Sequence, residues 1–153
     1  MPLLKAGGGL LLAYLNLYFR SWILPETVPY PDGFLILVVY YGVTRPRVPA
    51  MLLGTVAGLA QDSLSGTFGV HAFTKTTVGY LAGGLGSRFL LNQPLPQFLI
   101  LLAGTGFEVL LQRALLAVIG QGFAWPDPGW VLFAGVVNAV VGVAIFRIVE
   151  RFL

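Results

Sequence analysis

The sequence predicts an all-α integral membrane protein, a six-helix transmembrane bundle that forms a single domain over residues 1–153. Of its residues, 57% are hydrophobic and 10% are charged, whereas about 25% are charged in typical soluble domains. Apolar segments of helical length recur along the chain, with prolines at their joints. A soluble fold of this size could not bury so much apolar surface, so we expect a bilayer to surround the helices.

The apolar segments lie at residues 6–24, 31–43, 48–64, 70–91, 96–120 and 130–148. The first segment follows Lys5 and has the layout of a signal peptide. However, Arg20 and Trp22 occupy the place of a small-residue cleavage site. We therefore interpret this segment as a retained first helix.

The second segment is the shortest of the set. Its continuous apolar part, residues 34–43, would extend about 15 Å as a helix, roughly half of a hydrocarbon core of about 30 Å. It can reach across a bilayer only if the residues from Pro29 to Asp32 form the entry of the helix at the membrane surface. Proline is tolerated there because it is accepted in a first helical turn.

The distribution of Lys and Arg predicts the orientation. With both termini in the cytoplasm, the inner side holds Lys5, Arg45, Arg47, Arg88, Arg147 and Arg151. The outer connections then hold only Arg20 and the acids Glu26, Asp32 and Asp127. This asymmetry follows the positive-inside rule, and it is lost if the second segment does not span. The charge pattern therefore favours six spans.

Several function classes are excluded by composition. The chain has no cysteine, which removes disulfides, thiol nucleophiles and thiolate metal sites. It has one histidine and no basic run, so we predict no metal site and no nucleic-acid partner. No phosphate-binding loop or dinucleotide fingerprint is present, and we expect no cofactor.

Small residues recur at the spacing of close helix packing. The third segment carries Gly54 and Gly58, and the fourth carries Gly79 and Gly83. Each pair forms a GxxxG pattern, which lets two helix backbones approach closely in lipid. Because a six-helix chain has internal partners, we assign these pairs to packing within one subunit. Gly66 and Gly69 are assigned to the turn between the two segments.

Ionisable and amide side chains fall inside the apolar segments. We name them the polar kernel: Asp62, His71, Lys75, Glu108, Gln112 and Arg113. Counting residues from the helix ends places Asp62 and Lys75 at similar depth, where an ion pair would neutralise both. Arg113 comes to a comparable depth. Gln112 shares a helix face with Glu108 and could bond to Asn138.

Two interpretations of the polar kernel are compatible with each other. In the first, its charges balance and fix the helices in register. In the second, it lines a cavity open to the outside that receives a polar group of a partner, because ionisable residues within a membrane mark functional sites. The sequence leaves both open.

Asp62, Ser63, Ser65 and His71 lie within ten residues, and these residue types could in principle form a serine-hydrolase site. The recognisable nucleophile elbow is absent, and hydroxyl-rich turns between helices are ordinary. We predict that the protein is not an enzyme and has no catalytic residues.

The order of these features resembles the rod shape-determining protein MreD family. The resemblance is carried by Gly54, Gly58 and Asp62, then by Ser65, Gly66 and Gly69, and then by Ala72 and the GYLAG run from Gly79 to Gly83. It extends more loosely over the whole chain. Lys75, Glu108 and Arg113 are not matched to a family pattern.

The resemblance implies a non-enzymatic scaffold or regulator of the elongation complex in the bacterial inner membrane. It would bind an MreC-like bitopic protein, contact membrane lipids and act indirectly with MreB, RodA and the elongation transpeptidase in lateral peptidoglycan synthesis and cell shape. The family also implies a fold similar to the S-components of energy-coupling-factor transporters. The alternative function is therefore an S-component-like substrate-binding subunit of an ATP-driven vitamin transporter.

Overall fold

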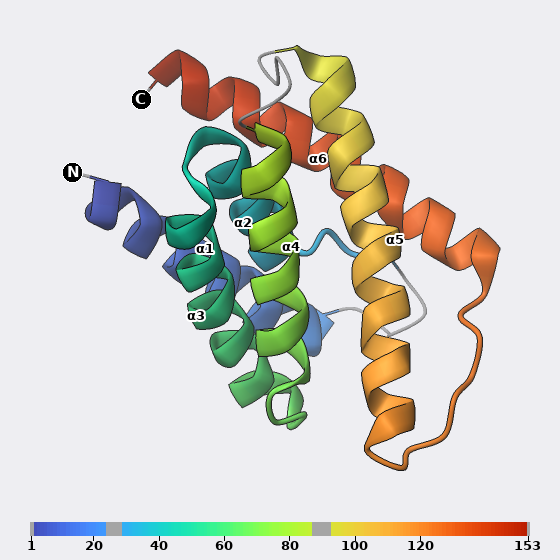
Figure 1. The fold of residues 1–153 in the computed structure, drawn as a ribbon. Coiled ribbons are helices and arrows are strands. Elements are labelled where there is room, and N and C mark those ends of the chain that lie inside the picture. Colours follow the sequence, from blue (N-terminus) through green and yellow to red (C-terminus); the bar gives the residue numbers. More distant parts are fainter. Residues whose placement is uncertain (1, 24–28, 87–92, 153) are drawn as a thin grey trace.

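The computed structural model describes residues 2–23, 29–86 and 93–152 (Figure 1). In these ranges the chain forms six helices and no strands: α1 (Pro2–Ile23), α2 (Gly33–Thr44), α3 (Arg47–Ser65), α4 (Val70–Gly86), α5 (Pro94–Val118) and α6 (Pro128–Phe152). The predicted all-helical class and number of helices are confirmed. The predicted continuation of the fourth helix to residue 91, and the charges of Glu26 and Arg88, fall outside the described residues.

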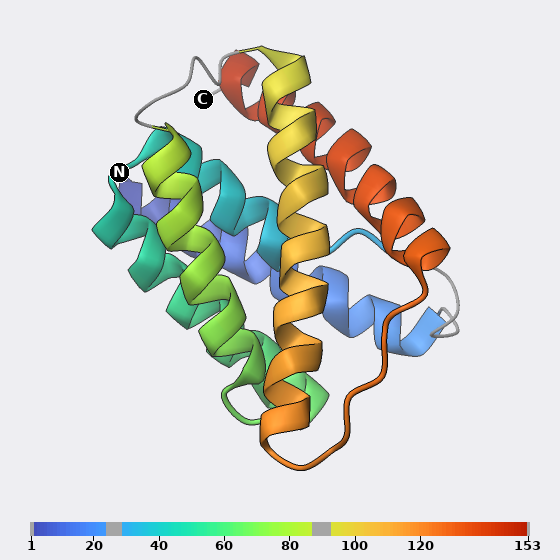
Figure 2. The ribbon, with the colours of Figure 1, turned by 45° about the vertical axis from the view of Figure 1, so that its right-hand side comes forward.

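The short helix α2 lies at the centre of the molecule, and the other five helices pack around it (Figures 1 and 2). Its 12 residues extend about 18 Å. Its buried side chains cover more than one face of the helix, and most of its other residues are half-buried, as expected for a helix that is hydrophobic on nearly every side. Its length therefore suits a place inside the bundle.

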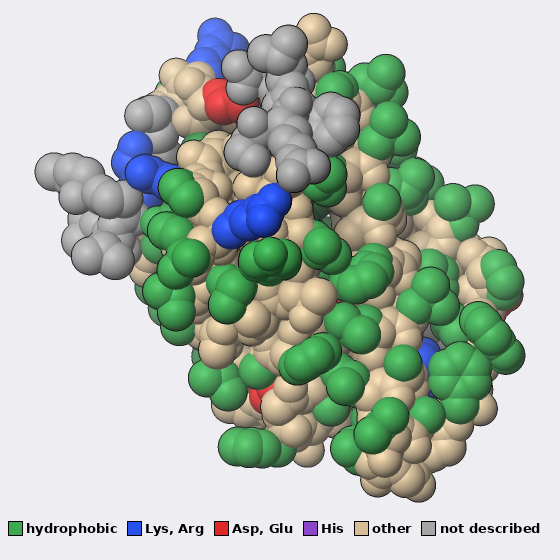
Figure 3. Space-filling model, in the orientation of Figure 1, with side chains coloured by type: hydrophobic (Ala, Val, Ile, Leu, Met, Phe, Trp, Pro, Cys, Tyr) green, Lys and Arg blue, Asp and Glu red, His purple; other side chains and the backbone are tan. Residues whose placement is uncertain are grey.

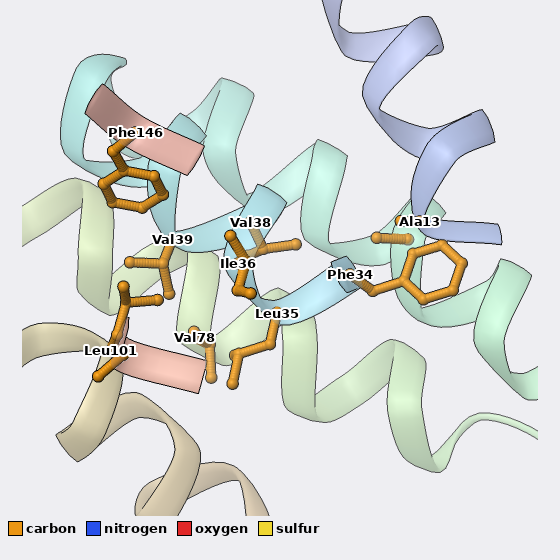
Figure 4. Packing of buried hydrophobic residues seen from close by; sticks show 11 residues of the cluster. Ala13, Phe34, Leu35, Ile36, Val38, Val39, Val78, Leu101 and Phe146 are labelled. Atoms are coloured by element: carbon orange, nitrogen blue, oxygen red, sulfur yellow. The ribbon is translucent and has the colours of Figure 1, made fainter. Parts of the chain in front are cut away.

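The apolar core forms where α2 meets its neighbours. Phe34, Leu35, Ile36, Val38 and Val39 of α2 pack with side chains from α1, α4, α5 and α6, including Ala13, Val78, Leu101 and Phe146 (Figure 4). Leu35, Val38 and Leu101 are fully buried. This core holds the helices at the positions from which their polar side chains converge.

The helices α3 and α4 run side by side and approach each other at glycines. A Cβ atom at Gly58 would meet the backbone of His71 and Ala72, and one at Gly54 would meet the carbonyl oxygen of Lys75. On the other helix, a Cβ at Gly79 would lie 2.5 Å from the carbonyl oxygen of Ala50. The glycine faces of the two helices therefore face each other within the subunit.

The turn between α3 and α4 depends on two glycines in the left-handed region. Gly66 has a φ of 71° and Gly69 a φ of 84°, values that residues with a Cβ atom rarely adopt. Gly66 also closes α3 by donating its N–H to the carbonyl oxygen of Asp62 at 3.1 Å. The turn returns the chain directly alongside α3.

The surface is widely apolar. Of the described helices, α5 and α6 are long and apolar enough to cross a membrane. Their exposed side chains include Leu95, Leu99, Phe107, Leu110, Leu132, Phe133 and Val140. Figure 3 shows hydrophobic side chains spread over the visible face, while most of its Lys and Arg side chains gather at the end that holds the chain termini. Apolar surface on this scale is expected to contact lipid.

Candidate functional site

Lys75 is the centre of a buried ion-pair network. Its side chain is 0% exposed, and its Nζ lies 2.9 Å from Asp32 Oδ2 and 2.5 Å from Glu108 Oε1. These residues belong to α4, to the cap of α2 and to α5. A lysine is almost never fully buried without a partner, and here two carboxylates provide it.

Asp32 takes this position because it caps α2. Its Oδ1 accepts hydrogen bonds from the backbone N–H groups of Phe34 and Leu35 at 3.0 and 3.1 Å, which leaves Oδ2 for Lys75. An aspartate immediately before a helix satisfies N–H groups that lack a partner within the helix. The cap therefore fixes one carboxylate oxygen and aims the other at α4.

Asn138 attaches α6 to this network. Its Oδ1 accepts a hydrogen bond from the backbone N–H of Asp32 at 2.7 Å, and its Nδ2 donates to Thr105 Oγ1 at 3.1 Å. Both Asn138 and Thr105 are buried. Four helices are thus connected: α2, α4 and α5 through the Lys75 ion pairs, and α6 through Asn138.

Gln112 extends the network to His71. Its Nε2 lies 3.2 Å from Glu108 Oε1 and 3.1 Å from His71 Nδ1. Because an amide nitrogen only donates, His71 Nδ1 is the acceptor, so a neutral His71 carries its proton on Nε2. The shared face predicted for Glu108 and Gln112 thus provides a hydrogen bond one helical turn apart.

Asp62 has a different role from the one expected. Its carboxylate accepts hydrogen bonds from the backbone N–H groups of Gly69, His71 and Ala72, each at 3.0 Å. The expected ion pair between Asp62 and Lys75 is wrong. The glycine turn folds the start of α4 over Asp62, whose charge then stabilises that helix N-terminus, while Lys75 reaches α2 and α5.

Two further expectations are corrected by the structure. Arg113 is exposed and takes no part in the network, because successive residues are rotated by about 100° around a helix and Gln112 occupies the inner face. Asn138 bonds to Asp32 and Thr105 instead of Gln112. Asp32 joins the network although it was not among the predicted kernel residues; an aspartate before an apolar helix is a recognised start signal that could have identified it.

Three residues of the kernel, Asp62, Lys75 and Glu108, are enclosed by the bundle. Lys75 is 0% exposed, while Asp62 and Glu108 are each 4% exposed. Their charged groups are therefore occupied by partners within the chain, and another protein could touch Lys75 or Glu108 only after the helices moved.

The residues considered for hydrolysis do not assemble a triad. Ser63 Oγ donates to the carbonyl oxygen of Ala60 at 2.7 Å, and Ser65 Oγ donates to that of Gln61 at 3.0 Å. Asp62 accepts from the backbone of His71, whose Nδ1 faces Gln112. Among the described residues, no group of three or more Asp, Glu or His side chains could hold a metal ion.

The role of Asp62 is tested by Asp62→Asn. We expect this change to lower the free energy of unfolding by about 2 kcal/mol, because charged hydrogen bonds to backbone N–H groups contribute roughly 1.5–3 kcal/mol. Thermal unfolding in mild detergent measures the loss. Asp127→Asn is the matched control, since Asp127 is exposed and accepts one backbone hydrogen bond, from Trp130. Equal losses in both variants would contradict the assignment.

Comparison with known proteins identifies the family. The model of the rod shape-determining protein MreD family matches residues 10–149, which is most of the chain. No curated protein and no solved structure gives a significant match, so similarity to the S-component fold stays a prediction. The match includes the kernel, the glycine pairs and the turn between α3 and α4. The chain therefore belongs to the rod shape-determining protein MreD family.

Proposed function

We propose that this protein is a non-enzymatic membrane scaffold of the rod-shape elongation complex. It resides in the bacterial inner membrane with both termini in the cytoplasm and binds an MreC-like bitopic protein. Through that protein it acts with MreB, RodA and the elongation transpeptidase in lateral peptidoglycan synthesis. Family membership supports a role in rod-shape determination, and the two long apolar helices support a membrane location.

The observation that supports the scaffold role is that the buried charges pair with one another within the chain. Lys75, Asp32 and Glu108 satisfy one another inside the bundle. Buried ionic groups fix specific helix arrangements in some systems. A chain in which charges connect α2, α4 and α5, and Asn138 connects α6, is suited to present one fixed outer surface to a partner helix.

In this proposal the kernel positions the docking surface without touching the partner. Asp62 and His71 determine how the turn between α3 and α4 is held, through the backbone cap and the contact with Gln112. Lys75 and Glu108 determine the separation of α4 and α5. A change in any of these residues alters the surface that the partner recognises.

The test is affinity purification of the tagged protein from native membranes in mild detergent, with partners identified by mass spectrometry. We expect an MreC-like protein in near-stoichiometric amount, with wall synthases in lower amount. Lys75→Ala and Asp62→Ala are expected to reduce its recovery several-fold at equal amounts of folded protein. The exposed Arg113→Ala is the control and is expected to retain it.

The possible outcomes separate two claims. Unchanged recovery with Lys75→Ala and Asp62→Ala would remove the kernel from partner binding and leave the scaffold role intact. Recovery of a transporter ATPase pair with its coupling membrane subunit, and no MreC-like protein, would overturn the scaffold role. That second result would favour the vitamin-transport alternative.

A further inference from the structure

The buried network around Lys75 has an unbalanced charge when all of its groups are ionised. One ammonium, on Lys75, lies between two carboxylates, on Asp32 and Glu108. The network continues through the amide of Gln112 to His71, whose Nδ1 accepts a hydrogen bond and is therefore not protonated. Two carboxylates and one ammonium leave a single negative charge in excess, and an uncompensated buried charge is strongly destabilising.

Among the described residues, no other side chain supplies the missing positive charge. Arg113, on the same helix as Glu108, is exposed, and Arg45 stands at the other end of α2 from the network. On α6 the network residue is the neutral Asn138, and the first charged residue of that helix, Arg147, lies about 14 Å further along its axis. The excess charge therefore needs a ligand that is itself positive.

The two carboxylates of the network are stabilised to different extents. Asp32 accepts hydrogen bonds at both of its oxygens, and its side chain is 22% exposed. It also caps the N-terminus of α2, where a negative charge is favoured. Glu108 lies inside α5, and its side chain is 5% exposed. A proton that neutralises the network is therefore expected on Glu108.

The hydrogen bonds of Glu108 leave one oxygen for this proton. Lys75 Nζ and Gln112 Nε2 both donate to Oε1. Within the described residues, Oε2 accepts no hydrogen bond. In a neutral carboxylic acid one oxygen carries the proton while the other stays an acceptor, and the two oxygens of Glu108 are divided in this way.

We propose that the network binds one proton, at Oε2 of Glu108. The bound proton brings the charge of the network to zero, because Lys75 then pairs with a charged Asp32 and donates to a neutral acid. Burying a neutral acid is far less costly than burying an uncompensated charge. Since Lys75 and Glu108 join α4 to α5, the proton links the packing of these two helices to the pH. The inference does not depend on the scaffold role.

The first test is infrared spectroscopy of the purified protein in mild detergent at about pH 6, where an ordinary glutamate, with a pKa of about 4.3, is ionised. The C=O stretch of a neutral carboxylic acid is separate from the bands of a carboxylate. We expect a neutral-acid band that Glu108→Gln removes. Glu150→Gln is the control, because Glu150 lies outside the network beside Arg147, and it is expected to retain the band. A spectrum without this band, or a band unchanged in Glu108→Gln, would overturn the proposal.

The second test compares unfolding in mixed micelles at about pH 6 and about pH 7. If the folded state holds a proton that the unfolded chain has released, the unfolding constant rises about tenfold per pH unit. Glu108→Gln is a neutral group of similar shape that cannot exchange this proton. We therefore expect the unfolding constant of the wild type, divided by that of Glu108→Gln, to rise about tenfold between the two pH values. An unchanged ratio would contradict the proposal.

The direction of the pH effect distinguishes Glu108 from His71. A proton on His71 Nδ1 would remove the acceptor that Gln112 Nε2 contacts, so the folded state would resist that proton and become more stable as the pH rises. The proton on Glu108 requires the opposite sign. A gain in stability from about pH 6 to about pH 7 that persists in Glu108→Gln would assign the pH effect to His71 and overturn the proposal.

Discussion

Replacing Lys75 by methionine is expected to lower the free energy of unfolding by about 3–5 kcal/mol, the largest effect of any single change considered for this protein. Methionine retains the apolar stem and removes the charge. Asp32 and Glu108 are then left facing each other without the cation that both contact. Removing one partner of a buried ion pair is strongly destabilising because an uncompensated charge stays buried.

The measurement is the midpoint of unfolding in mixed micelles as the fraction of denaturing detergent is raised, followed by circular dichroism. Arg113→Met is the matched control, because Arg113 is exposed on α5. Exposed substitutions of this kind usually change stability by less than about 0.5 kcal/mol. A Lys75→Met midpoint equal to that of Arg113→Met would show that the network does not stabilise the bundle.

A compensating variant isolates the electrostatic cause. Asp32→Asn/Lys75→Met/Glu108→Gln replaces all three charges by neutral groups of similar size. We expect it to recover most of the stability lost in Lys75→Met, since neutral replacement of a whole buried ionic cluster is often tolerated. Failure of the triple variant to recover any stability would assign the loss to packing of the lysine stem instead of charge.

Introducing a methyl group at Gly58 is expected to separate α3 from α4. The added Cβ would overlap the Ala72 Cα and the His71 carbonyl oxygen, which belong to the facing backbone and cannot rotate away. Overpacking of a close contact costs roughly 1–3 kcal/mol. We therefore expect Gly58→Ala to lose about that much stability, and Gly58→Leu to lose more.

Gly106→Ala on α5 is the matched control, since a Cβ at Gly106 would meet nothing within 4 Å. Alanine is favoured over glycine inside a helix by about 0.5–1 kcal/mol. The same unfolding assay should therefore show Gly106→Ala at or above the wild-type midpoint and Gly58→Ala below it. The reverse order would show that the close approach of α3 and α4 is not required.

The all-helical class, the number and order of the helices, and the joints between them could be predicted from the sequence alone. These properties are local: long apolar stretches predict helices in lipid, and proline and glycine predict the breaks. The GxxxG patterns of Gly54 with Gly58 and of Gly79 with Gly83 likewise predicted close packing, because the absence of a side chain is itself the feature that permits it.

The hydrogen-bond and ion-pair partners of the polar side chains could be identified only from the tertiary structure. Counting residues from a helix end gives the depth of Asp62 and Lys75 but neither the rotation of each helix nor its neighbours. The turn placed backbone N–H groups against Asp62, which removed it from the reach of Lys75. The central position of α2 then brought Asp32 to Lys75. Depth gives only one of the three coordinates of a side chain. The energy of an ion pair depends on the distance between its two charges, and this distance requires all three coordinates.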